Sequence, residues 1–193
     1  MKSVYLILDM QNDLVGSSID PMKSPTKAEA NRRGIVQRTA EAIQRARSSD
    51  VQVGFVRVAF QSNYANCPSG SPVFSGARTN GLFRDGSPGT EVIAELQPAP
   101  TDWLITKSRV SPFYATNLET YLRAAQIGRI YCSGVSTQAV VQATVRDAHD
   151  RDYEVVLLED CCAAHSAEEH QNSVQSLGRF CRIASSQDVD FQA

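Results

Sequence analysis

The chain has no long apolar run and little net charge. Its longest apolar runs, such as residues 155–158, are far shorter than the roughly 20 residues that a membrane-spanning helix needs. The 19 Lys and Arg residues nearly balance the 21 Asp and Glu residues, which gives a formal net charge of −2. This balance argues against nucleic acid or an anionic membrane surface as the main partner. We therefore expect neither as a partner.

The sequence also lacks a disulfide framework. Its cysteines are Cys67, Cys132, Cys161, Cys162 and Cys181, an odd number without regular spacing. Three of them lie in or beside apolar segments, where free thiols usually pack as small hydrophobic side chains. Met1 is followed at once by a strand-like segment, so we expect no signal peptide. These features predict a reduced, cytoplasmic protein.

Motifs for phosphate, dinucleotide or metal binding are missing as well. The chain has no Walker or dinucleotide glycine motif. Its three histidines, His149, His165 and His170, are not clustered at the spacing of a zinc site. We therefore expect no metal and no cofactor.

Short apolar runs alternate with segments of helical periodicity. The runs predict strands at residues 4–8, 51–59, 102–106, 129–133, 153–158 and 181–184. The periodic segments predict helices at residues 27–48, 90–96, 117–126, 137–150 and 167–177. Alternating strands and helices imply parallel pairing, right-handed crossovers and helices on both faces of the sheet. The near-continuously apolar strands agree, because a sheet covered on both faces has no polar side.

We therefore predict an α/β fold, a three-layer α/β/α sandwich around a mainly parallel sheet of about six strands. A length of 193 residues suits one domain, and we expect residues 1–193 to form it. Only the glycine- and proline-rich residues 61–88 interrupt the alternation, and a loop this long is usually functional or mobile. Arg78 and Arg84 in this loop could bind a substrate carboxylate, or they could be solvated surface residues.

Candidate catalytic residues follow the predicted strands, because ligands bind at the carboxyl ends of the strands in an open parallel sheet. Asp9 follows the first strand, Lys107 the third, and the turn at residues 134–138 the fourth. A carboxylate and a lysine brought together there could form a proton-transfer pair. Asp9 could equally cap the next turn while Lys107 lies at the surface. Backbone N–H groups at the helix start after residue 136 favour an anion or a developing oxyanion.

Three segments in this order resemble the isochorismatase-like hydrolase family, which includes cysteine hydrolases of the nicotinamidase and N-carbamoylsarcosine amidase kind. They read LILDMQNDLV (6–15), PGTEVIAEL to ITKSRVSPFYATNLETYL (88–122) and SGVSTQAVVQATVRDAHDRDYEVVLLEDCCAA (133–164). Only residues 61–87 lack a clear counterpart. In the cysteine hydrolases the aspartate of the first strand is the general base, the lysine lies beside it, and the nucleophilic cysteine begins the helix after the fourth strand.

The resemblance implies Asp9 as the aspartate, Lys107 as the lysine and Val140 at the position of the nucleophile. A valine cannot attack a carbonyl carbon, so the thioester route is closed at this position. None of the five cysteines falls at the helix start. Val140 instead fits an apolar stripe with Thr144 and Ala148 at helical spacing.

The resemblance also implies a binding site, a turn geometry and an assembly. Its substrate-binding positions are Gln11, Arg109, Phe113, Val135, Ser136, Thr137 and Ala139. It implies a strained turn at residues 134–137 with a cis peptide bond between Val135 and Ser136, and a homodimer or homotetramer.

The resemblance predicts a hydrolase acting on a small polar metabolite. Members similar to true isochorismatases lack the cysteine and hydrolyse a vinyl ether with the aspartate as acid. Asp9 could serve as that proton donor if burial holds its proton, and Lys107 would oppose this by favouring the carboxylate. Two alternatives remain open. The chain could be a non-catalytic binding protein that has lost its nucleophile, or an amidase whose cysteine is replaced by Val140, naturally or by engineering.

Overall fold

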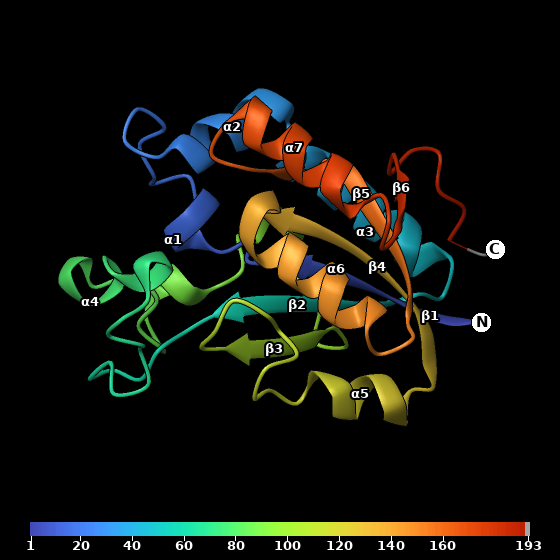
Figure 1. Ribbon diagram of the computed structural model, residues 1–193, viewed down its shortest axis with the longest axis horizontal. Coiled ribbons are helices and arrows are strands. Elements are labelled where there is room, and N and C mark those ends of the chain that lie inside the picture. The colour runs from blue at the N-terminus through green and yellow to red at the C-terminus, as the bar shows by residue number, and fades with distance from the viewer. Residues whose placement is uncertain (192–193) are drawn as a thin grey trace.

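The computed structural model describes residues 1–191 and contains one six-stranded parallel sheet (Figure 1). The strands are β1 (Lys2–Leu8), β2 (Gln52–Val58), β3 (Trp103–Lys107), β4 (Ile127–Val135), β5 (Glu154–Ala163) and β6 (Arg182–Ala184). They lie in the order β3-β2-β1-β4-β5-β6, and every neighbouring pair is parallel. The predicted α/β fold with a parallel sheet is confirmed. Among residues 1–191, none of the helices has the length and apolarity that crossing a bilayer requires.

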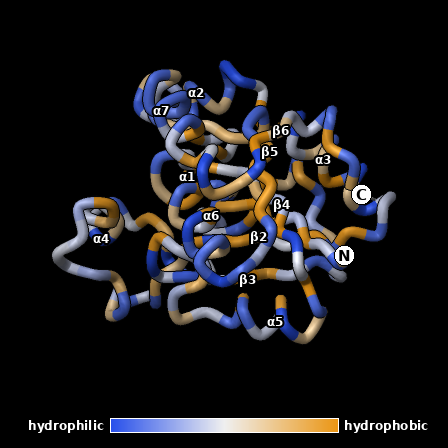
Figure 2. Tube along the Cα trace, turned by 45° about the vertical axis from the view of Figure 1, so that its right-hand side comes forward, coloured by the Kyte–Doolittle hydropathy of each residue, from blue (hydrophilic) through white to orange (hydrophobic). Residues whose placement is uncertain are grey.

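Helices cover both faces of this sheet. The helices are α1 (Asn12–Val15), α2 (Pro25–Arg33), α3 (Ile35–Ser48), α4 (Ala77–Asn80), α5 (Leu118–Ala124), α6 (Gln142–His149) and α7 (Ala167–Leu177). Alternate residues of β1 point to opposite faces, so Tyr5 and Ile7 pack in one apolar cluster with residues of α2 and α3. Leu6 and Leu8 pack in a second cluster with residues of α5, α6 and α7. Figure 2 shows the hydrophobic residues gathered along the strands between the helices.

Two of the predicted helices differ from the structure. Residues 27–48 form two helices, because Gly34 ends α2 in the left-handed conformation with φ 64°. The helix predicted at residues 90–96 is wrong. This segment holds only the 3₁₀ turns Pro88–Thr90 and Ala94–Leu96, and Val92 between them forms an antiparallel bridge with Gln11. Its backbone groups pair with the chain after β1, so they do not close a helix.

The long loop at residues 61–88 folds onto an apolar cluster of its own. It contains a 3₁₀ turn at Pro72–Phe74 and the short helix α4. Phe74 packs edge-on against Phe60 with ring centroids 5.1 Å apart, and Phe83 joins the same cluster. The N–H of Phe83 donates to Oδ2 of Asp13 at 2.6 Å, which fastens the loop to α1. The loop is thus a packed segment beside the carboxyl end of the sheet.

Candidate active site

Asp9 and Lys107 meet at the carboxyl edge of the sheet. Nζ of Lys107 donates to Oδ2 of Asp9 at 2.9 Å, and the two residues are only 3% and 6% exposed. The contact arises because β1 and β3 flank β2 in parallel, so the residues at their ends share one edge. The contact predicted from the strand ends is therefore present, and Asp9 is not a simple turn cap.

The surroundings of Asp9 favour proton exchange. Burial raises the pKa of the Asp9 carboxyl group above its ordinary value, and the neighbouring Lys107 opposes part of that rise. Oδ1 of Asp9 is buried without a hydrogen-bond partner among residues 1–191. Asp9 also has a left-handed backbone with φ 54°, a conformation that non-glycine residues adopt at a cost of about 1–3 kcal/mol and that is common at functional sites. One oxygen is thus held by lysine, while the other has no hydrogen-bond partner among residues 1–191.

Both residues line a cavity of about 510 Å³, a size suited to a small metabolite. Its walls come from the ends of β1 to β4, the π-helical turn Thr137–Val141, residues 72–83 of the loop, and the start of α7. The end of β4 and the turn after it supply Val135, Ser136, Ala139 and Val140, four of the predicted site positions.

The turn between β4 and the π-helix has the predicted geometry. The Val135–Ser136 peptide bond is cis, as expected. Gly134 before it has φ 135°, and a Cβ atom there would lie 2.1 Å from the carbonyl oxygen of Leu8. Only glycine fits this position, because the turn passes directly against β1.

Val140 is a packing residue that also faces the cavity. It is 2% exposed and belongs to the apolar cluster that contains Ala148. The hydroxyl of Thr144 donates to its carbonyl oxygen at 2.7 Å, so the predicted stripe is present. Its correspondence to the family nucleophile stays a prediction.

All five cysteines lie outside the cavity lining. Burial raises the pKa of the Cys132 and Cys162 thiols well above the ordinary value, and that of Cys161 to about 12. Burial also raises the pKa of Cys181 to about 11. None of these four thiols supplies a thiolate near neutral pH.

Two predicted substrate-binding residues do not line the cavity because their side chains are used inside the fold. The amide group of Gln11 donates to the carbonyl oxygen of Val58 at 3.1 Å and accepts from its N–H at 2.8 Å. Gln11 therefore ties the segment after β1 to β2. Thr137 is fully buried, and its Oγ1 lies 2.9 Å from Nδ1 of His170.

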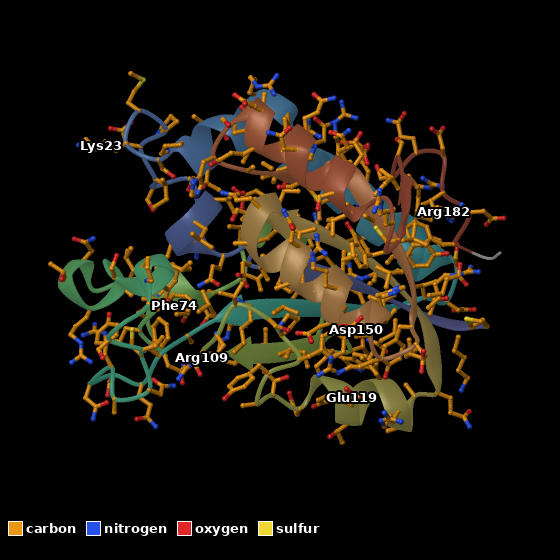
Figure 3. All side chains as sticks on the ribbon, viewed as in Figure 1. Lys23, Phe74, Arg109, Glu119, Asp150 and Arg182 are labelled. Carbon is orange, nitrogen blue, oxygen red and sulfur yellow. The ribbon has the colours of Figure 1, made fainter. Side chains whose placement is uncertain are left out.

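Arg109 and Phe113 also lie outside the cavity lining. Arg109 donates to the carbonyl oxygen of Asn66 at 2.9 Å, so it braces the loop (Figure 3). Phe113 packs near Tyr153, with ring centroids 6.3 Å apart. Both side chains pack against neighbouring segments of the chain, and their predicted place against the substrate stays a prediction.

Arg78 and Arg84 complete the predicted set. Arg78 donates to the carbonyl oxygen of Tyr64 at 3.0 Å, and its guanidinium group lies 5.9 Å from the centre of that ring. Arg84 is exposed, and neither arginine lines the cavity. The solvated alternative fits Arg84, whereas Arg78 stabilises the loop.

Several residues that line the cavity were not predicted from the sequence. Phe74 and Phe83 come from the loop, and His165 and Glu169 from the start of α7. The only signal was the length of the loop, since no periodic pattern marks its inward-facing residues. Gln138 also lines the cavity, and its Oε1 is buried without a partner among residues 1–191.

A hydrogen-bond chain holds the turn from behind. His170, 5% exposed, contacts Thr137 through Nδ1 and Oε2 of Glu159 through Nε2 at 3.2 Å. Arg33 donates to the same Glu159 oxygen at 2.9 Å. Burial, with a further contribution from Arg33, lowers the pKa of His170, so the ring is neutral near pH 7. The chain links α2, β5, α7 and the π-helical turn.

Comparison with known proteins places these features in a wider group. Residues 3–188 match the isochorismatase domain family, a span that includes every residue lining the cavity. The chain is 31% identical over 156 residues to the uncharacterized isochorismatase family protein YecD of Escherichia coli O157:H7, covering 80% of this chain and 81% of that protein. It is 27% identical over 180 residues to the ureidoacrylate amidohydrolase RutB of Rhizobium rhizogenes, covering 82% and 69%.

Among solved structures, the crystal structure of N-carbamoylsarcosine amidase from Thermoplasma acidophilum is similar, with a TM-score of 0.77 and 26% identity. The likeness covers 98% of this chain and 99% of that one. It therefore extends over the whole three-layer arrangement.

Proposed function

Because the chain belongs to the isochorismatase family of hydrolases, we propose that it hydrolyses a small polar metabolite in the cavity over Asp9 and Lys107. Water is the attacking group, and no covalent enzyme intermediate forms. One observation carries this proposal. The cavity presents a buried carboxyl group with one free oxygen, whereas all five cysteines lie elsewhere.

Hydrolysis of a vinyl ether suits this arrangement best. Asp9 in its acid form gives its proton to the terminal vinyl carbon, and the ether oxygen then shares the positive charge of the adjacent carbon. Water adds to that carbon and returns a proton to Asp9, and the hemiketal breaks into a carbonyl compound and an alcohol. The raised pKa of Asp9 supports the acid form. Lys107 stabilises the carboxylate that exists between the two proton transfers.

Hydrolysis of an amide is the second candidate, favoured by the relatives that are named as an amidohydrolase and an amidase. Here Asp9 in its carboxylate form takes a proton from water as the water attacks the carbonyl carbon. Asp9 then gives that proton to the leaving nitrogen, so the amide yields a carboxylic acid and an amine. Water replaces the thiol in this scheme, because Val140 offers no nucleophile.

The test is a substrate screen with purified wild type and Asp9→Asn, read by mass spectrometry of products. The panel holds isochorismate and other vinyl ethers together with primary amides and ureido and N-carbamoyl compounds. We expect turnover of at least one compound by wild type and a loss of about 10²–10⁴-fold in Asp9→Asn, the usual size of acid–base contributions. Asp20→Asn, which alters an exposed carboxylate, serves as the matched control and should retain full activity.

Equal turnover by wild type and Asp9→Asn would contradict the proposed role of Asp9. An inert wild type that still binds a small ligand would favour the alternative of a non-catalytic binding protein.

A further inference from the structure

We infer that the substrate joins one compact polar group to an apolar body and carries no more than one negative charge. This inference rests on the proposed function, because it takes the cavity over Asp9 and Lys107 as the substrate site. It goes beyond that function by naming the class of molecule that the cavity accepts.

The loop supplies an apolar wall. Pro72, Val73, Phe74 and Phe83 all line the cavity, and none of them carries a polar side chain. Phe74 and Phe83 are 7% and 8% exposed and are fixed in the aromatic cluster around Phe60. Because these side chains are already ordered, contact with an apolar ligand lowers the binding free energy without the entropic cost of ordering them.

The exposed side chain of Val73 also favours a ligand with an apolar body. Its side chain is 62% exposed although it lines the cavity next to the buried Phe74. An apolar group of a ligand would cover this surface, whereas a strongly hydrated ligand would gain nothing there.

The charges around the cavity limit the charge of the ligand. The charged lining residues are Asp9, Lys107 and Glu169, with His165 as a further titratable group. Lys107 is paired with Asp9, and Glu169 repels a second anionic group. Nδ1 of His165 lies 3.9 Å from Oε2 of Glu169, so a protonated His165 would form an ion pair with that carboxylate.

No arginine is present among the described lining residues: Arg109 and Arg78 have other contacts, and Arg84 is an exposed residue of the loop. Arg109 donates to backbone oxygens, and Arg78 stacks near Tyr64. Phosphate groups and pairs of carboxylates need several such donors, because a buried anion without a partner is strongly unfavourable. With Asp9 in its acid form, Lys107 can balance one carboxylate of a ligand, and the described lining offers no further lysine or arginine for a second.

The polar end of the cavity sets the other requirement. Oδ1 of Asp9 and Oε1 of Gln138 are both buried without a hydrogen-bond partner in the described part of the chain. A ligand that satisfies them places a compact hydrogen-bonding group at this end and its apolar body against the loop.

The test measures binding of four small probes by isothermal titration calorimetry and ligand-observed NMR. Benzamide has the apolar body and a neutral polar group, and benzoate replaces that group with one charge. Benzene-1,2-dicarboxylate adds a second charge, and acetamide removes the apolar body. We expect benzamide and benzoate to bind, and the other two to bind at least about tenfold more weakly, a difference that calorimetry resolves readily.

Variants locate the binding. Val73→Ser changes an exposed side chain, so folding is retained, and we expect benzamide affinity to fall about threefold. Phe74→Ala should lower it by at least about tenfold. The control is Tyr114→Ser, because Tyr114 is 63% exposed and lies outside the cavity lining.

Three results would overturn the inference: no binding of benzamide, equal binding of the mono- and dicarboxylate, or equal binding of acetamide and benzamide. Failure of the proposed function gives a different pattern, in which the probes bind as expected but no compound shows turnover that depends on Asp9. Efficient turnover of the dicarboxylate isochorismate would support the function and overturn the inference.

Discussion

The hydroxyl oxygen of Thr137 lies 2.9 Å from Nδ1 of His170, across the gap between the π-helical turn and α7. Nε2 of His170 faces the carboxylate of Glu159, so the neutral ring carries its proton on Nε2 and Nδ1 accepts from Thr137. The turn that follows the cis peptide bond is therefore anchored by a single directed hydrogen bond. Thr137 and Val140 belong to the same turn, so this bond also positions one wall of the cavity.

The first prediction tests this anchor with a double-mutant cycle. Thr137→Val and His170→Phe should each lower the free energy of unfolding by about 1–3 kcal/mol, because each leaves a buried polar atom without its partner. The loss of unfolding free energy in the double variant should be smaller than the sum of the two single losses by about 1 kcal/mol. Urea unfolding provides the measurement. Ser173→Ala removes a separate contact of α7 with Gln142 and should be additive with Thr137→Val.

The second prediction concerns the buried ion pair. Lys107→Met leaves the carboxylate of Asp9 without its cation and should cost about 3–5 kcal/mol of stability at neutral pH. The loss should shrink at acid pH, because protonation of Asp9 removes the unpaired charge. Urea unfolding from pH 4 to 8 tests this. A pH-independent loss would show that Asp9 carries no charge in the folded variant.

The third prediction follows from the raised pKa of Asp9 in the folded chain. Between the ordinary value and the raised one, the native state binds more protons than the unfolded state, so stability falls as pH rises through this window. Asp9→Asn should remove that part of the pH dependence in thermal unfolding.

The same residue sets the pH profile of turnover. If Asp9 donates the proton, as for a vinyl ether, kcat/KM falls as pH rises through its pKa. If it accepts a proton, as for an amide, kcat/KM falls as pH drops below it.

The fourth prediction separates thiol chemistry from water chemistry. Thiol-alkylating reagents should leave wild-type turnover intact, because no cysteine lines the cavity. Val140→Cys places a thiol near the start of a helical segment, where N–H dipoles lower its pKa and Asp9 can accept its proton. We expect this variant to gain amidase activity that alkylation abolishes.

A matched control for that variant is Val141→Cys, since Val141 is fully buried and lies outside the lining. Val141→Cys should gain no amidase activity. If Val140→Cys is equally inert on every amide tested, the correspondence of Val140 to the family nucleophile loses its support.

The sheet and the reactive pair could be predicted from sequence because both depend on local patterns. Apolar runs mark the strands; Asp9 directly follows β1, and Lys107 is the last residue of β3. Parallel pairing then brings the two ends together regardless of the segments in between. The break at Gly34 is also local in origin, since a glycine within a helical pattern is a common helix end.

The cavity wall could not be predicted, because it depends on contacts between distant segments. Phe83 is placed by Asp13, which is 70 positions earlier in the chain, and Phe74 is placed by Phe60. Gln11 and Arg109 carry polar groups near the site, yet their partners are backbone groups that no sequence pattern reveals. The segment at residues 90–96 has helical periodicity, but pairing with the chain after β1 determines its conformation.

The attachment of the loop has a consequence for redesign. Its wall residues at Pro72–Phe74 and Phe83 lie on one continuous loop, whereas Asp9 and Lys107 belong to the ends of strands. Asp13 joins the two parts, and Gly89 leaves room for it, since a Cβ atom there would lie 2.1 Å from Oδ1 of Asp13. In the proposed function, the loop contributes to selectivity and the strand ends carry the reaction. Combinatorial libraries confined to residues 72–82, with Asp13 and Gly89 untouched, would explore new ligands without disturbing the proton-transfer pair.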